Sequence, residues 1–275
     1  SYDLRTLWVA NEQSNTLTPI DAKTGKVGAN VAVDDPYNLY FTPDGTFAIV
    51  VAERLQRLDF RDPHTMALIK SVPVACPGVD HMDYTVDGRY GIATCEFCGK
   101  LVKVDIAAQA VVGYLVLDSL RGDQGTPQDI RSSPDGSVFY VADMSADGVY
   151  LVNPTTFTTI GFVPTGTGAH GLYPSRDGKL LYVTNRGWHK PMGPAKGPGS
   201  ISVIDFATRK VVANWPISGG GSPDMGNVTA DGKELWISGR FDGEVYVFDT
   251  QTGQLAHRIP VARGPHGLTV WPQPG

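Results

Sequence analysis

Hydrophobic and polar positions along the chain fall into short, strand-sized runs separated by turn residues. Five of the Asp-Gly pairs recur at similar spacing between stretches rich in Val, Ile, Tyr, Phe and Trp, and such a pair predicts a hairpin turn. The pairs begin at Asp44, Asp87, Asp135, Asp177 and Asp231. No segment keeps the 3.6-residue period of an amphipathic helix, so the pattern predicts an all-β chain.

A second phrase follows each hairpin: a strand, an Asp or Asn that starts a turn, and another strand, as in "ISVIDFATRKV". Four strands in about 42 residues are typical of a β-propeller blade. We therefore predict one domain, residues 1–275, that forms a six-bladed propeller of four-stranded antiparallel blades. The C-terminal strand is expected to join the N-terminal blade and close the ring. The predicted blades are 266–275 with 1–34, 36–74, 77–117, 127–164, 168–217 and 222–261.

Three of the second strands carry a shared sequence: "LYVTN" at 181–185, "LWVAN" at 7–11 and "FYVAD" at 139–143. The chain resembles, over essentially its whole length, the YVTN-repeat propellers of bacteria, a superfamily with lactonase-like and haem nitrite-reductase-like members. The resemblance implies the propeller fold and an extracytoplasmic location, periplasmic or secreted, with the signal peptide removed. It does not select one activity, because relatives include lactonases, lyases and haem-binding proteins.

Composition and charge narrow the classes of partner. The 275 residues are 41% hydrophobic and carry a net charge of −5, with Lys and Arg scattered rather than clustered. Nucleic acid is not an expected partner, because binding it requires a clustered basic face. No apolar run reaches the roughly 18 residues of a membrane span. We expect a monomer, since a closed ring leaves no edge that must pair.

One phrase occurs twice: "GTGAHGL" at 166–172 and "RGPHGL" at 263–268. Its histidines, His170 and His266, start predicted inner strands, as does His81. In a six-membered ring the three lie on alternate blades and converge at the channel mouth. Three imidazoles with open positions are typical of a zinc or copper site, so we predict a divalent metal there. His81 stands six residues before its Asp-Gly pair and His170 seven, so a bulge has to restore the match.

Carboxylates and arginines accompany the histidines at the strand ends. Asp80, Asp129 and Asp224 are predicted at comparable places, and Asp129 and Asp224 are candidate general bases. Arg186 and Arg240 follow second strands and are candidates to clamp a carboxylate. The alternative is structural for each group: polar residues here often tie neighbouring blades together.

The longest insertion is "NRGWHKPMGPAKGPGS" at 185–200. It is predicted on the same face as the histidines, where Trp188 and His189 are candidates to contact a cofactor or to form a lid. Packing of Trp188 on a neighbouring blade is the alternative.

All three cysteines fall in the predicted third blade. Cys76, Cys95 and Cys98 suit a disulfide from Cys76 to Cys95 or Cys98, with one thiol left over. The alternatives are a metal knuckle completed by His81, and plain buried thiols.

Two functions follow from these residues. The first is a metal or small-ligand site at the channel mouth, with hydrolysis or elimination on a lactone-like or carboxylated substrate as its chemistry. The second is a non-catalytic propeller that uses the same face for a protein or cofactor partner.

Overall fold

The computed structural model describes residues 1–190 and 192–271. The chain divides into two compact units, Ser1–Gln124 and Gly125–Gly275.

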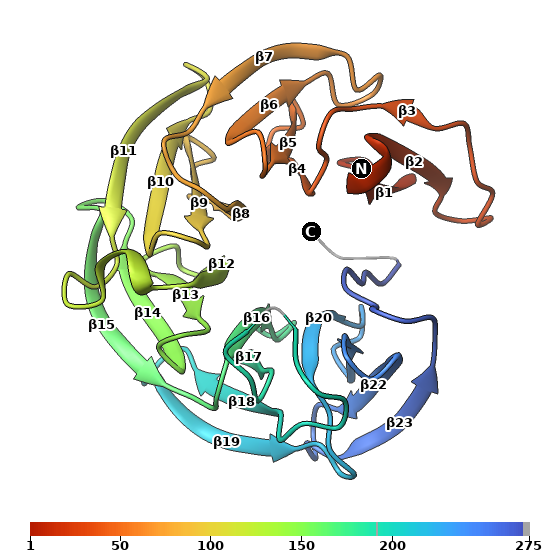
Figure 1. Ribbon diagram of the computed structural model, residues 1–275, viewed down its shortest axis with the longest axis vertical. Coiled ribbons are helices and arrows are strands. Elements are labelled where there is room, and N and C mark those ends of the chain that lie inside the picture. Colours follow the sequence, from red (N-terminus) through yellow and green to blue (C-terminus); the bar gives the residue numbers. More distant parts are fainter. Residues whose placement is uncertain (191, 272–275) are drawn as a thin grey trace. The chain divides into compact units, whose positions relative to one another are not determined.

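The first unit contains three antiparallel sheets that follow one another along the chain (Figure 1). The first sheet is β1 (Thr6–Asn11), β2 (Thr16–Asp21) and β3 (Val31–Ala32). The second is β4 (Asn38–Phe41), β5 (Ala48–Ala52), β6 (Arg57–Arg61) and β7 (Leu68–Pro73). The third is β8 (Val79–Tyr84), β9 (Tyr90–Cys95), β10 (Lys100–Asp105) and β11 (Ala110–Val116). Two 3-10 turns, η1 (Glu12–Ser14) and η2 (Gly122–Gln124), lie in the loops.

The second unit contains three four-stranded sheets of the same kind. The first is β12 (Pro127–Ser132), β13 (Phe139–Asp143), β14 (Gly148–Asn153) and β15 (Thr158–Pro164). The next is β16 (Ala169–Pro174), β17 (Leu180–Asn185), β18 (Ser200–Asp205) and β19 (Lys210–Pro216). The last is β20 (Pro223–Val228), β21 (Glu234–Gly239), β22 (Glu244–Asp249) and β23 (Leu255–Pro260).

Six consecutive antiparallel meanders make this the six-bladed all-β propeller, and the predicted fold class is confirmed. The first sheet has three strands among the described residues, and residues 262–271 form no strand. The predicted closing strand, 266–275, extends into residues 272–275, which lie outside the described residues. Closure by that strand therefore stays a prediction.

The Asp-Gly hairpins share one set of hydrogen bonds. Ser133 donates its hydroxyl hydrogen to the carboxylate of Asp135 at 2.6 Å, and the backbone N–H of Ser137 donates to the same carboxylate at 3.0 Å. A Thr or Ser stands two residues before the aspartate in all five turns, and the glycine has a φ near +70°. The aspartate sets the turn and the glycine adopts its left-handed backbone conformation, which aligns the first two strands of five of the six sheets.

Apolar side chains pack between successive sheets within each unit. In the first unit Phe60 and Val102 belong to one buried cluster, and in the second unit Tyr246 and Phe248 belong to another. Second strands such as β13 are buried at both faces, whereas outer strands such as β11 alternate between partly buried and exposed positions. This packing leaves the polar ends of the inner strands as the places where buried charges gather.

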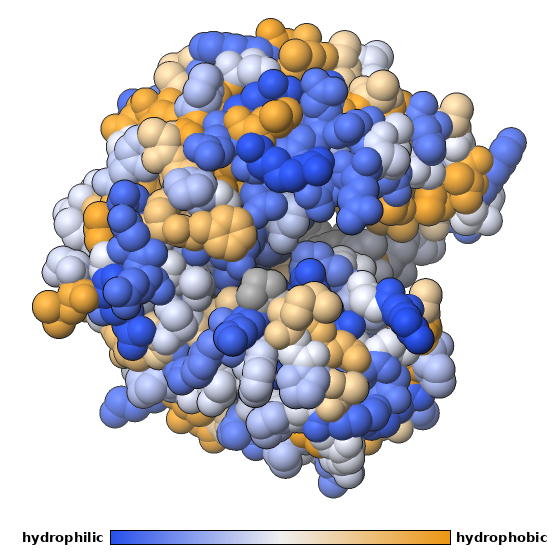
Figure 2. Space-filling model, in the orientation of Figure 1, coloured by the Kyte–Doolittle hydropathy of each residue, from blue (hydrophilic) through white to orange (hydrophobic). Residues whose placement is uncertain are grey.

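The surface is mixed in character. On the face drawn in Figure 2, hydrophobic residues stand in small groups among hydrophilic ones. Among the described residues, no helix has the length and hydrophobicity needed to cross a lipid bilayer.

Candidate functional site

A β-bulge interrupts four of the inner strands at the same register. In β8, for example, Val79 pairs with Cys95 and Met82 pairs with Ala93, so Asp80 and His81 are the bulged residues. The same shift occurs in β12, β16 and β20. The bulged pairs are Asp80 and His81, Gln128 and Asp129, His170 and Gly171, and Asp224 and Met225.

This register corrects the expected equivalence of the polar residues. His170 matches Asp80 and Asp224, whereas His81 matches Asp129 one residue later. His81 stands six residues before its Asp-Gly pair and His170 stands seven before its own. Because both strands have the same bulge, it does not compensate for this difference. Convergence of His81 with His170 and His266 stays a prediction, since His81 belongs to the first unit and the other two to the second.

Hydroxyl groups on the second strands fill the bulges. Thr184 accepts a hydrogen bond from the N–H of Gly171 at 2.6 Å and donates to the carbonyl of Asp224 at 2.8 Å. Ser238 accepts from the N–H of Met225 at 3.2 Å and donates to the carbonyl of His266 at 2.7 Å. Each hydroxyl thus links its own bulge to the backbone of a residue that carries a site side chain.

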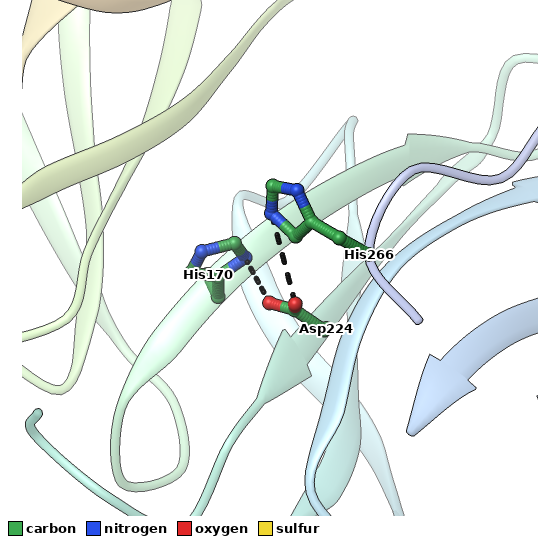
Figure 3. Close-up of side chains that lie close together, drawn as sticks. All are labelled: His170, Asp224 and His266. Atoms are coloured by element: carbon green, nitrogen blue, oxygen red, sulfur yellow. Dashed lines mark ion pairs between the residues drawn. The ribbon is translucent and has the colours of Figure 1, made fainter. Parts of the chain in front are cut away.

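Asp224 is the centre of the site in the second unit. His170 places Nδ1 3.2 Å from Oδ1 of Asp224, and His266 places Nε2 3.7 Å from Oδ2. Figure 3 shows both imidazoles pointing toward this carboxylate, and their ring centroids are 6.4 Å apart. One ligand atom from each of the three residues lies within 4.8 Å of the others.

Two guanidinium groups bind the same carboxylate. Arg186 donates from Nε to Oδ1 at 2.8 Å, and its Nη2 donates to the same oxygen. Arg240 places Nη1 3.5 Å from Oδ2. Both predicted clamp arginines are therefore at the site, and each contacts a carboxylate of the protein itself.

The side chains of this site differ in their exposure to solvent. Asp224 is fully buried, His170 and Arg186 are nearly so, and the side chains of Arg240 and His266 are 29% and 31% exposed. Burial lowers the pKa of His266 below its usual 6.5; Asp224 opposes this shift, and the guanidiniums of Arg240 and Arg186 add to it. His266 is thus neutral near pH 7, and two guanidiniums surround the one carboxylate.

Asp129 and His81 each have polar partners within their own unit. Oδ2 of Asp129 accepts from the N–H of Leu172 at 2.9 Å, and Oδ1 accepts from Arg131 at 2.8 Å. Asp129 therefore ties β12 to β16. His81 contacts Tyr40 through Nδ1 at 3.2 Å and Asp80 through Nε2 at 3.3 Å, within the first unit.

The long insertion is anchored at several points. His189 pairs with Asp147 at 2.7 Å, and the Lys196 ammonium pairs with Glu244 at 2.7 Å. A Cβ on Gly168 would stand 2.3 Å from the carbonyl oxygen of Trp188, so that glycine lets the insertion approach β16. The indole of Trp188 is 40% exposed, and a cofactor or lid role for it stays a prediction.

The cysteines form a disulfide between Cys76 and Cys95, and Cys98 is a buried free thiol. Of the alternatives that the sequence left open, this is the disulfide with one thiol left over. A metal knuckle would need Cys76 and Cys95 as thiolates, so it applies only to the reduced chain.

Sequence reasoning missed the bulge hydroxyls Thr184 and Ser238 and the sulfur of Met144, which lies 3.7 Å from Nη1 of Arg186. Aligning the repeats on their second strands gives a signal for the hydroxyls, because Thr94 has the same contact with His81. Met144 gives no such signal, since methionine is common in protein cores.

Comparisons with known proteins agree with the fold. The Kuenenia stuttgartiensis hydrazine synthase structure superposes with a TM-score of 0.79 and 21% identity, over 97% of this chain and 86% of that one. A sequence identity of 21% supports a shared fold and nothing about activity. No curated protein matches the chain.

The YNCE-like beta-propeller family matches residues 1–111 and 194–273, which is more than half of the chain. This chain belongs to the YNCE-like β-propeller family.

Proposed function

We propose that the second unit binds a small anionic ligand of the carboxylate class at Arg240 and His266. The observation that carries this proposal is the charge balance, since two guanidiniums share the single carboxylate of Asp224. A bound anion would neutralise the remaining positive charge.

Arg186 and Arg240 differ in burial, and the two guanidiniums therefore have different roles in the proposed site. Arg186 is buried with its charge opposed by Asp224, so both groups are less accessible than Arg240. Arg240 is partly exposed and holds Asp224 more loosely, at 3.5 Å, so its guanidinium has donors left for a ligand. A guanidinium fork suits the planar geometry of a carboxylate, and His266 adds a donor beside it.

A divalent metal, zinc or copper, is the second candidate for this site. It is favoured by the proximity of one ligand atom each from His170, Asp224 and His266. A metal ion would have to displace or approach two guanidiniums, whose positive charge opposes it. The anion is therefore the stronger proposal.

The proposal assigns binding rather than chemistry to the site. Both oxygens of Asp224 already face guanidiniums, and both oxygens of Asp129 accept hydrogen bonds from β12 and β16. A hydrolase or lyase would need a base with a free oxygen beside the substrate. The same binding site serves equally in a non-catalytic scaffold whose partner presents a carboxylate.

We also propose an extracytoplasmic location. The disulfide between Cys76 and Cys95 supports it, because such bonds persist in oxidising compartments.

The test is titration calorimetry with sodium benzoate, with inorganic phosphate at the same ionic strength as the second arm. The proposal expects saturable benzoate binding that His170→Ala retains and Arg240→Gln weakens at least tenfold. Phosphate binding without benzoate binding would reassign the ligand to the phosphate class. Failure of both anions would overturn the proposal.

The metal candidate is tested on protein purified without a chelator or histidine tag. One equivalent of zinc or copper by elemental analysis, lost in His170→Ala, would support the metal site. Stoichiometric metal together with no anion binding would replace the first proposal by the second.

A further inference from the structure

One position recurs directly after each second strand. The second strand pairs with the third up to Cys95 and Lys100 in one sheet, and up to Gly239 and Glu244 in another. The recurring position is the residue that directly follows the last paired residue of the second strand. In chain order these residues are Glu12, Glu53, Glu96, Met144, Arg186 and Arg240. The first unit has glutamate in all three sheets, and the second unit has methionine and two arginines.

In three of the six sheets the backbone holds this position by the same hydrogen bond. The N–H groups of Glu96, Met144 and Arg186 each donate to the residue just before the inner strand of the same sheet. The acceptors are the carbonyls of Gly78, Thr126 and Gly168, at 2.6, 3.1 and 2.9 Å.

Neighbouring members of this series act on one another. Arg186 contacts the sulfur of Met144, and Arg186 and Arg240 share Asp224. In the first unit the negative fields of Glu96 and Glu12 add to burial in raising the pKa of Glu53. The side chains at this position therefore influence one another within each unit, and the sign of their charge differs between the two units.

We infer that the residue after the second strand determines the charge of the ligand, and that Arg240 is the specificity-determining residue of the anion site. This inference rests on the proposed function. Arg186 already neutralises the buried Asp224, so Arg240 supplies the surplus positive charge. Arg240 is also the more exposed of the two guanidiniums, and a ligand reaches it first.

The repeat itself supplies the substitutions for a test. Arg240→Glu introduces the residue that three other sheets have at this position, and Arg240→Met introduces the residue of the β12–β15 sheet. Arg186 is unsuitable, because changing it would leave Asp224 buried with less compensation.

A matched control exists in the same sheet. Lys233→Glu makes the same change of charge in the Asp231–Gly232 turn, where the lysine side chain is 80% exposed. Circular dichroism and melting temperature establish that each variant folds. If Arg240→Glu does not fold, Arg240→Met alone tests the inference.

Calorimetry with benzoate and with inorganic phosphate gives the readout. We expect at least tenfold weaker anion binding in Arg240→Met, no measurable binding in Arg240→Glu, and binding within twofold of wild type in Lys233→Glu. Wild-type binding that both Arg240 variants keep within threefold would overturn the inference and the placement of the ligand at Arg240, and would leave only anion binding by the protein standing. Absence of binding in the wild type would overturn both.

Discussion

At the residue scale, the site depends on how one buried carboxylate is compensated. Asp224 is fully buried and interacts with Arg186, Arg240, His170 and His266. Such a group is tolerated in a protein interior only because its partners replace the water it loses. The same partners make the site cationic overall, which links its stability to its proposed ligand.

Replacing Asp224 by Asn is expected to destabilise the protein by about 3 kcal/mol, because Arg186 would be left buried and poorly compensated. Urea denaturation of the variant measures the change in free energy of unfolding. Lys179→Ala, which removes an exposed ion pair with Asp177, is the control and should cost well under 1 kcal/mol. Equal costs in the two variants would contradict this account of Asp224.

Glu53 gives a pH-dependent prediction. Burial, followed by the fields of Glu96 and Glu12, raises its pKa from 4.5 to about 7. A carboxyl group whose pKa is raised on folding contributes stability below its unfolded pKa, and that contribution is lost as pH rises through the folded value. Glu53 thus favours folding below pH 4.5 and ceases to do so between pH 4.5 and about 7.

Glu53→Gln should therefore match the wild type near pH 4 and exceed its stability above pH 7, by about 1 kcal/mol after solvent screening. Denaturation midpoints across this pH range measure the difference. A difference that does not change with pH would refute the role of Glu53 ionisation.

At the element scale, the bulged inner strand connects the fold to the site. Each bulge leaves a backbone N–H without the hydrogen bond that regular strand pairing would provide. In three of the sheets this N–H donates instead to a hydroxyl group of the second strand. Thr184 and Ser238 extend the same contact to the carbonyls of Asp224 and His266. The bulge thereby fixes the backbone from which the site side chains project.

Thr184→Val keeps the shape of the side chain and removes the hydroxyl. It should cost about 2 kcal/mol, because the N–H of Gly171 and the carbonyl of Asp224 lose their buried partner. Thr184→Ser restores the hydroxyl and should recover most of the loss in chemical denaturation. Wild-type stability in Thr184→Val would show that the bulge does not depend on this contact.

At the scale of the whole molecule, the disulfide links stability to the compartment. Cys76 and Cys95 are 19 residues apart in sequence, and a loop of this length corresponds to about 3 kcal/mol in the chain-entropy account. Replacing both by Ser should lower the melting temperature by several degrees, as measured by calorimetry without reductant. Cys98→Ser retains the disulfide and should melt near the wild type. A double variant as stable as Cys98→Ser would remove this support for an oxidising compartment.

The sequence by itself determined the repeat, the strands and the hairpins, and through them the six-bladed fold. These features depend on local chemistry: Asp-Gly requires a turn, and β-branched and aromatic runs prefer strands. The sequence also placed His170, His266, Asp224, Arg186 and Arg240 among its candidates. It predicted the histidines as metal ligands and the arginines as a separate site for a ligand carboxylate. The sequence shows which residues end the strands, but it does not show which of those residues contact one another.

Only the tertiary structure decided how those residues are combined. The bulge recurs in β8, β16 and β20 and preserves their relative spacing, so His170 matches Asp224 and Asp80 rather than His81. Packing of successive sheets then brought Arg186 onto Asp224, whereas Arg240 reaches the same carboxylate from within its own sheet. Pairing of β8 with β9 brought Cys95 close to Cys76. Register and burial arise from contacts between distant segments, and hydrophobic pattern alone does not record which polar side chains will compensate one another.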